Sequence, residues 1–221
     1  MPKIFNPNHL FAGDTAFEVL PSNGMVSGET VCSWTEDWWR WTVRQPLSNT
    51  GDANWDNNGS FESTQPSGGM YFLAGSWGSD PAAGTVRGTD QNPIHVPAGS
   101  PILVPIFTLI SSQFQSDPKN YNNVTLKDWK VSVNDLFLKI DGQDVKNLQS
   151  DLVRTGVFSA GAPAPDTIGA YLADPATGSP DGLKSIGYWG VVALAPGAHQ
   201  IEFGGSSPTY SVHVIDKVMA S

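Results

Sequence analysis

Short runs of apolar residues recur along the chain, and most of them are five to nine residues long. Gly, Pro, Asn and Asp separate these runs, and that combination predicts β-strands joined by turns. In chain order, the predicted strands are residues 16–20, 70–74, 94–96, 102–110, 136–140 and 187–194, followed by a hairpin over 200–215. Asp141 and Gly142 directly follow the fifth run, and this pair is typical of a two-residue hairpin turn. The pattern therefore predicts a mainly antiparallel β fold.

One segment has helical rather than strand periodicity. Trp34, Trp38 and Trp41 recur at positions i, i+4 and i+7, which places them on one face of a helix. Ser33 followed three residues later by Glu36 is a capping-box pattern, and a proline ten residues after Glu36 ends the helix. We expect the tryptophan face to pack the helix onto a sheet. The alternative is a platform on which sugar rings stack, since indole rings offer large flat faces.

The alternation in the last hairpin predicts its register. Ile201 and Phe203 share one strand face, and Tyr210 and Val212 share one face of the next strand. Pairing Phe203 with Tyr210 and Ile201 with Val212 places all four side chains on the core side, whereas a slip by one residue exposes Val212. In this register His213 faces outward.

The composition agrees with a turn-rich β protein. The 221 residues include 23 glycines, 17 prolines and eight tryptophans, and only 15% are charged, against about 25% in an average domain. We therefore predict one domain over residues 1–221. Its expected fold is a mainly β, antiparallel β-sandwich with the Trp-rich helix packed against it, and a jelly roll is one form that such a sandwich takes.

The net charge and the length of the apolar runs argue against two classes of partner, nucleic acid and the membrane interior. The formal net charge is −9, and the 12 basic residues are scattered, whereas phosphate binding needs clustered Lys and Arg. Nucleic acid is therefore not an expected partner. No apolar run reaches the ~18–20 residues that span a bilayer, so membrane insertion is not expected either. Residues 1–7 lack the apolar segment of a secretory signal peptide. Cys32 is the only cysteine, which excludes an intramolecular disulfide.

Several short motifs, in this order, resemble a family of functionally uncharacterised, mostly bacterial β-rich proteins, many of them secreted. After the Trp-rich segment come Tyr-Phe-Leu-Ala-Gly at 71–75, Val-Pro-Ala-Gly at 96–99 and Gly-Tyr-Trp at 187–189. The resemblance implies a single β-rich domain and no known chemistry. Members of the family often carry two cysteines where this chain has Phe61 and Ile94. The resemblance implies that these two apolar side chains are buried in mutual contact.

A polar loop offers the one candidate metal site. Oxygen-bearing side chains alternate there as they do in calcium-binding loops. The four residues are Asp52, Asn54, Asp56 and Asn58. The loop departs from the EF-hand pattern, because Asn57 stands at the position that requires glycine and Ser63 replaces the final glutamate. The alternative is an ordinary loop, since Asn and Asp tolerate tight turns. No other cofactor is expected.

No catalytic residue can be nominated. The chain has no Gly-x-Ser-x-Gly motif, and its four histidines show no zinc-ligand spacing. The predicted register places His199 and His213 on opposite faces of the last hairpin. Cys32, at the expected helix start, is a candidate for a lowered thiol pKa, but a lone cysteine among apolar residues is more often a small core residue.

These observations favour a non-enzymatic structural or assembly protein of an extracellular layer, filament or particle. Residues 209–215 contain no Lys or Pro, so this strand, if it lies at a sheet edge, could pair with another copy in a homo-oligomer. An interior strand is the alternative. The first rival function is a carbohydrate-binding module that uses Trp55, Trp77 or Trp189 on its surface. The second rival is a hydrolase of unknown type.

Overall fold

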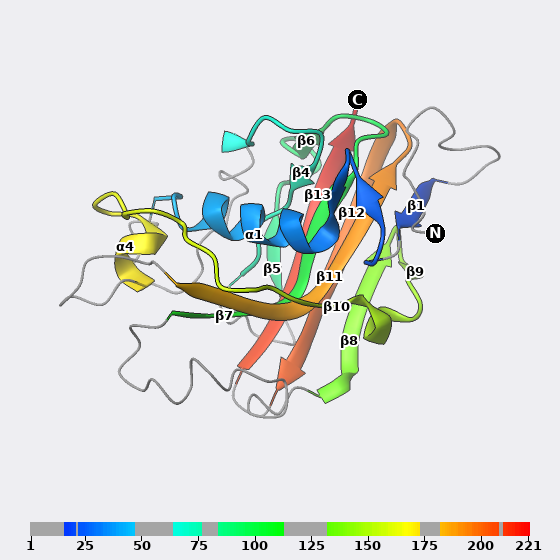
Figure 1. Ribbon diagram of the computed structural model, residues 1–221. Coiled ribbons are helices and arrows are strands. Elements are labelled where there is room, and N and C mark those ends of the chain that lie inside the picture. Colours follow the sequence, from blue (N-terminus) through cyan, green and yellow to red (C-terminus); the bar gives the residue numbers. More distant parts are fainter. Residues whose placement is uncertain are drawn as a thin grey trace.

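The computed structural model describes seven ranges of the chain. These are residues 16–20, 22–46, 64–76, 84–112, 132–172, 182–207 and 210–221. The fold is mainly β, as the sequence predicts, and two sheets contain most of the strands (Figure 1).

The first sheet is built around two long strands. Its order is β1 (Phe17–Leu20), β11 (Leu183–Leu194), β7 (Ile102–Ser112) and β4 (Tyr71–Phe72), and β10 (Leu152–Arg154) also pairs with β11. The second sheet has the order β5 (Thr85–Arg87), β13 (Tyr210–Ala220), β12 (Gly197–Ser207), β8 (Ser132–Ile140) and β9 (Gln143–Asp144), and β6 (Ile94–Val96) also pairs with β13. The long neighbours are antiparallel, whereas the short strands β4, β5 and β6 pair in parallel.

Shorter elements complete the described chain. A small ribbon of β2 (Met25–Val26) and β3 (Glu29–Thr30) leads into the helix α1 (Val31–Thr42). A 3₁₀ turn, η3 (Leu148–Asp151), precedes β10, and a short helix, α4 (Ile168–Leu172), precedes β11.

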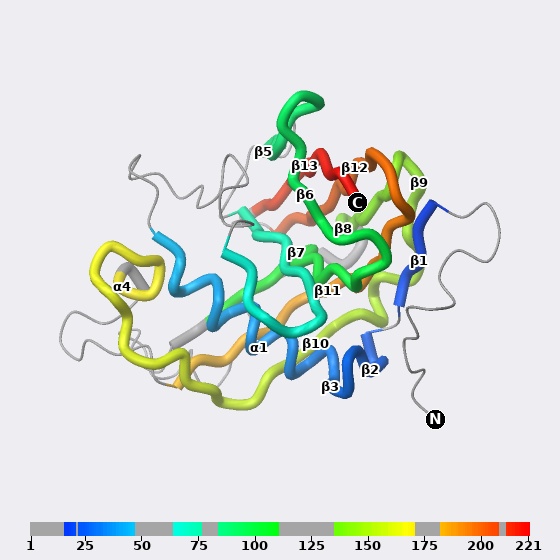
Figure 2. The backbone as a smooth tube through the Cα atoms, turned by 90° about the horizontal axis from the view of Figure 1, so that it is seen from above, coloured from blue at the N-terminus to red at the C-terminus, as the bar shows by residue number. Residues whose placement is uncertain are grey.

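Alternating residues of the first sheet pack into two separate hydrophobic cores, one on each face of the sheet. Ile102, Val104 and Ile106 on β7 pack in one cluster with residues of the second sheet such as Phe203, while Leu103 packs in the other cluster with the tryptophans of α1. The result is a sandwich-like stack of helix, first sheet and second sheet, which is visible from above in Figure 2. The two long strands of the first sheet, β7 and β11, are buried on both faces, which explains the unbroken apolar run in β7.

Helix α1 begins earlier than the sequence pattern predicts. Thr30 is its N-cap, because the Thr30 hydroxyl accepts a hydrogen bond from the Ser33 backbone N–H at 3.2 Å. Ser33 lies inside the helix, and its hydroxyl donates to a Glu29 carboxylate oxygen at 2.7 Å. The prediction of Ser33 as the cap is therefore wrong. The predicted i, i+4 ion pair between Glu36 and Arg40 is present at 3.1 Å.

The tryptophan face packs α1 onto the first sheet. Trp34, Trp38 and Trp41 retain only 6%, 2% and 6% of their accessible surface. The Trp38 ring meets the Trp189 ring edge to face, with 5.1 Å between centroids, and its indole N–H donates to the Leu73 carbonyl at 2.6 Å. The interpretation of the stripe as a packing face is confirmed, and it leaves these rings little surface for stacking on a sugar.

The last hairpin has the predicted faces but not the predicted register. Phe203 pairs with Val214 and Ile201 with Asp216, so β13 is displaced by four residues from the expected pairing. A displacement by an even number of residues leaves every side chain on its expected face. Ile201, Phe203 and Val212 are accordingly buried, and His213 lies on the outward face, half-buried.

The terminal strand β13 pairs with β12 along its whole length. On its other side β5 covers Val214–Asp216 and β6 covers Val218–Ala220. The interior-strand alternative therefore holds for Val214 and Ile215, while for residues 210–213 no described strand lies on that side, so the edge hypothesis stays a prediction there. The first sheet also protects the edge at β4, where the Gln65 side-chain amide both accepts from the Phe72 N–H and donates to the Phe72 carbonyl. This amide occupies the backbone groups to which an added strand would bond.

Two further predictions concern local features. Asp141 and Gly142 both have positive φ, 52° and 77°, and join β8 to β9 in the predicted two-residue turn. Ile94 is 5% exposed and packs in the core between the sheets. Its expected partner Phe61 lies outside the described residues, so their contact stays a prediction.

A buried ion pair joins β5 to β13. The Arg87 guanidinium donates to both carboxylate oxygens of Asp216, one bond being 2.7 Å between Nε and Oδ1, and both side chains are fully buried. Asp216 lies on the core face of β13, between Val214 and Val218. The pair therefore fixes β5 to the last strand within the core.

Candidate functional site

The residues selected from the sequence do not form a site among the described residues. Trp55 and Trp77, and all four candidate calcium ligands, lie outside the described ranges. Trp189 is 1% exposed beneath α1, so the expectation that its ring lies on the surface is wrong. A bulky side chain on the helix-facing side of β11 is buried by α1, which the sequence of β11 alone does not reveal.

Two of the described histidines, His199 and His213, and the cysteine have structural partners. His199 Nδ1 lies 2.8 Å from an Asp141 carboxylate oxygen and its Nε2 lies 2.8 Å from the Ala195 carbonyl oxygen. Burial, and secondarily the nearby Glu36 carboxylate, raise the pKa of the Cys32 thiol above its usual value. A raised pKa keeps the thiol protonated at neutral pH, which is the opposite of the lowered value expected of a helix-start nucleophile. Within the described ranges, no three His, Cys, Asp or Glu side chains are grouped to hold a metal ion.

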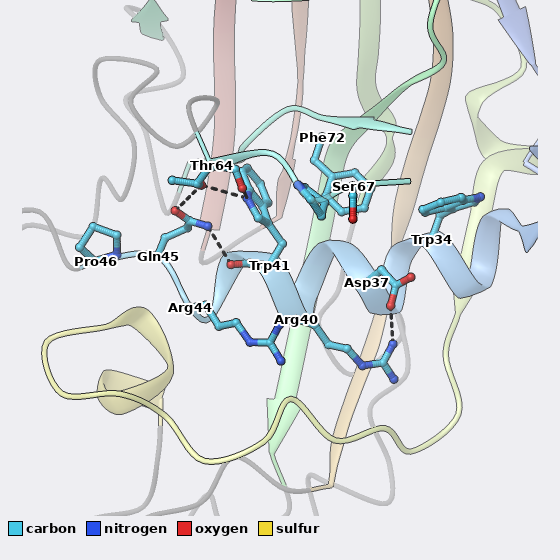
Figure 3. Close-up of a pocket in the computed structure, with 11 residues that line it drawn as sticks. Trp34, Asp37, Arg40, Trp41, Arg44, Gln45, Pro46, Thr64, Ser67 and Phe72 are labelled. Atoms are coloured by element: carbon cyan, nitrogen blue, oxygen red, sulfur yellow. Dashed lines mark hydrogen bonds and ion pairs between the residues drawn. The ribbon is translucent and has the colours of Figure 1, made fainter. Parts of the chain in front are cut away.

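An open pocket of about 510 Å³ lies along the C-terminal half of α1 (Figure 3). This volume falls in the range of about 300–1,000 Å³ typical of small-molecule sites. The pocket is lined by Trp34, Asp37, Arg40, Trp41, Arg44, Gln45, Pro46, Thr64, Pro66, Ser67 and Phe72. Two segments therefore build it: the end of the helix with the residues that follow, and the segment 64–72.

A hydrogen-bond network holds these two segments together. The Trp41 indole N–H donates to the Thr64 carbonyl at 3.0 Å, and the Thr64 hydroxyl donates to the Gln45 side-chain oxygen at 2.8 Å. The Gln45 amide in turn donates to the Trp41 carbonyl at 3.0 Å. Gln45 is buried, so these bonds satisfy an amide that would otherwise be costly to bury. The wall of the pocket is thus fixed to the helix end.

The two arginines of the pocket differ in their partners. Arg40 contacts Asp37 at 2.7 Å and Glu36 at 3.1 Å, and its Nε donates to the Ser159 carbonyl. Arg44 is exposed, and its guanidinium makes no ion pair with any residue that the structure describes. Figure 3 shows both arginine side chains extending from the same side of α1. Arg40 is therefore neutralised, while Arg44 brings a positive charge to the rim.

The arrangement is suited to binding a polar ligand. Trp34, Trp41 and Phe72 form the apolar floor of the pocket; each indole is 6% exposed and Phe72 is fully buried. Two exposed residues, Ser67 and Arg44, also line the pocket, and Figure 3 shows their side chains on opposite sides of α1. A few polar groups around an apolar floor are the usual composition of a site for a small organic molecule.

Sequence reasoning missed most of this site. The tryptophan stripe and the Glu36–Arg40 pair give the position of α1. Thr64 and Ser67 come more than 20 residues after the helix, and no sequence motif links them to it. The spacing of Asp37, Arg40 and Arg44, which places three charged side chains on one helix side, was the signal present in the sequence.

Comparison of the chain with family models, with curated proteins and with solved structures finds no match. Among the helices in the described parts of the chain, none has the length and apolar character needed to cross a membrane.

Proposed function

We propose that this protein is a non-enzymatic binding protein that holds a carbohydrate in the pocket along α1. The observation that carries the proposal is one open volume of about 510 Å³, lined by the exposed residues Ser67 and Arg44 over a floor of largely buried aromatic side chains. Sugars present apolar C–H faces and a rim of hydroxyl groups. Aromatic side chains contact such C–H faces, while side chains such as Ser67 and Arg44 hydrogen-bond to hydroxyl groups.

The pocket also has the rigidity that binding requires. The network of Trp41, Gln45 and Thr64 is complete without a ligand, so the wall does not have to order when a sugar arrives. Binding to a preformed wall avoids the entropy cost of immobilising side chains.

A blocking substitution tests the proposal. Ser67 is exposed at the pocket rim, so Ser67→Trp fills the pocket without disturbing a buried side chain. We expect the wild-type protein to bind at least one saccharide of a glycan array saturably, and Ser67→Trp to lose that signal. Ser67→Ala is the matched comparison: it leaves the pocket open and removes one hydrogen-bonding hydroxyl, so it should weaken binding without abolishing it. An array with no saturable signal, or a Ser67→Trp protein that binds like the wild type, contradicts the proposal.

Self-assembly in an extracellular layer, filament or particle is the second candidate function. One observation favours it: β5 is an outer strand of the second sheet, and its Val86 is 52% exposed. An exposed apolar side chain on an outer strand is a place where another copy can add. Association would then use β5, which covers Val214–Asp216 of β13.

Light scattering of an edge variant tests the assembly function. If copies associate through β5, the wild type is an oligomer at micromolar concentration, and Val86→Lys makes it a monomer because the charge blocks the edge. Val157→Lys is the control, since Val157 is also exposed, at 59%, and lies outside β5. A monomeric wild type up to high concentration removes this function. Proline at Val212 is unsuitable as a test, because Val212 is buried in the β12–β13 ladder and the substitution would disrupt the fold.

A further inference from the structure

We infer that the ligand of the α1 pocket carries a carboxylate, as a uronic-acid saccharide does, and that Arg44 binds this group. The inference rests on the proposed carbohydrate-binding function and names the class of sugar. The carbohydrate-binding function is argued from the volume and lining of the pocket. The acidic class of sugar is argued from the charged side chains around it.

One of the two arginines that line the pocket has no acidic partner among the described residues. Asp37, Arg40 and Arg44 are its charged lining residues. Asp37 is already bound to Arg40 at 2.7 Å, and Glu36 approaches the same guanidinium from outside the lining. Arg44 therefore supplies positive charge that no acidic side chain of the described residues neutralises. An anionic group placed beside it gains an ion pair without displacing an existing one.

The rest of the protein makes this local charge more selective. The formal net charge is −9, so an acidic sugar is repelled by most of the surface and attracted at a rim whose arginine has no ion-pair partner among the described residues. Arginine also matches a carboxylate in shape, because its planar guanidinium can donate two parallel hydrogen bonds to the two oxygens. A neutral sugar can use only part of that donor set.

Arg44 has a second possible role that the experiment separates from ligand binding. It follows the last turn of α1, where a cation interacts favourably with the helix dipole. A role confined to the helix end would change the melting temperature of the protein without changing which sugar it prefers. The experiment therefore records both thermal stability and the preference for acid over neutral sugar.

Calorimetric titration with matched sugars tests the inference. The probes are trigalacturonate, trimannuronate and a hyaluronan tetrasaccharide, each compared with its neutral methyl ester. We expect the wild type to bind at least one acid about ten-fold more tightly than its ester, as one added ion pair to arginine warrants. Arg44→Gln, which removes the charge and keeps a hydrogen-bonding side chain, should bind acid and ester equally. Arg154→Gln is the control, because Arg154 is exposed on β10 outside the pocket, and it should keep the ten-fold preference.

The outcomes separate the two proposals. Equal binding of acid and ester by the wild type overturns the inference and leaves the carbohydrate-binding function in place. An acid preference that survives Arg44→Gln also overturns it, because another group then reads the carboxylate. An Arg44→Gln protein that melts lower but keeps the preference assigns Arg44 to the helix end alone. If no acid and no ester binds, the inference of an acidic sugar is overturned. The carbohydrate-binding function survives that result only if a neutral glycan binds the wild type and fails to bind Ser67→Trp.

Discussion

Replacing Asp216 by alanine is expected to lower the free energy of unfolding by about 3–5 kcal/mol, the cost of removing one partner of a buried ion pair. Asp216 and Arg87 are both fully buried, and two hydrogen bonds join them. Without the carboxylate, the Arg87 guanidinium would keep its charge in the core between the sheets. Urea unfolding followed by circular dichroism measures the loss, because the far-ultraviolet signal reports the sheets.

An exposed ion pair provides the control for this experiment. Lys146 and Asp144 lie 2.8 Å apart, but their side chains are 74% and 55% exposed. Asp144→Ala should therefore cost no more than the roughly 0–1 kcal/mol typical of surface pairs. Equal losses for Asp216→Ala and Asp144→Ala would show that the Arg87–Asp216 pair does not hold β5 to β13.

Replacing Trp189 by alanine is expected to cost about 3–5 kcal/mol, as truncation of a large aromatic core residue does. The ring is 1% exposed and packs against Trp38, so its removal leaves a cavity between α1 and the first sheet. Trp189→Phe should lose clearly less, because part of the ring volume remains. Thermal and urea unfolding measure both variants.

The Trp189 variants also separate a core residue from a sugar platform. A tryptophan that stacks on a ligand can be removed with little loss of stability and a large loss of binding. We expect the reverse for Trp189→Phe, which should bind saccharides as the wild type does. A Trp189→Ala protein as stable as the wild type would contradict the packing of α1 on β11.

Local sequence patterns were sufficient to predict most of the elements. The alternation of apolar residues locates β7, β8 and β11, and the spacing of Trp34, Trp38 and Trp41 locates α1. These predictions succeed because each depends on one face of one element, which a few neighbouring residues define. The start of α1 was missed because Thr30 and Ser33 both fit the cap preference, and the β2–β3 ribbon that precedes the helix decides between them.

Asp216 shows why the register of the last hairpin was missed. The apolar run is interrupted by Asp216, so the predicted strand ends at Ile215. The best pairing of the residues before it is then a short hairpin over residues 200–215. In the structure the strand continues to Ala220, because Arg87, 129 residues earlier in the chain, neutralises Asp216 on the core face. No local pattern contains that partner. A charged residue in a strand is thus not a strand end when a distant element supplies the opposite charge.

The pocket was missed for a related reason. Its positive charge depends on which arginine is already paired, and its wall depends on bonds from Trp41 and Gln45 to Thr64. Sequence spacing places Arg40 and Arg44 on one side of α1, but the Ser159 carbonyl that helps to hold Arg40 comes from another part of the fold. Tertiary structure therefore distinguishes the paired arginine from the one that has no ion-pair partner among the described residues.

The most direct test of the pocket is a titration of ¹⁵N-labelled protein with an acidic trisaccharide, followed through the tryptophan indole N–H signals. Trp34 and Trp41 line the pocket, and their signals are assigned with Trp34→Phe and Trp41→Phe variants. We predict that these two signals shift most and saturate together, while the buried Trp189 signal stays in place. Saturable shifts at other tryptophans, with those of Trp34 and Trp41 unchanged, would contradict a ligand site along α1.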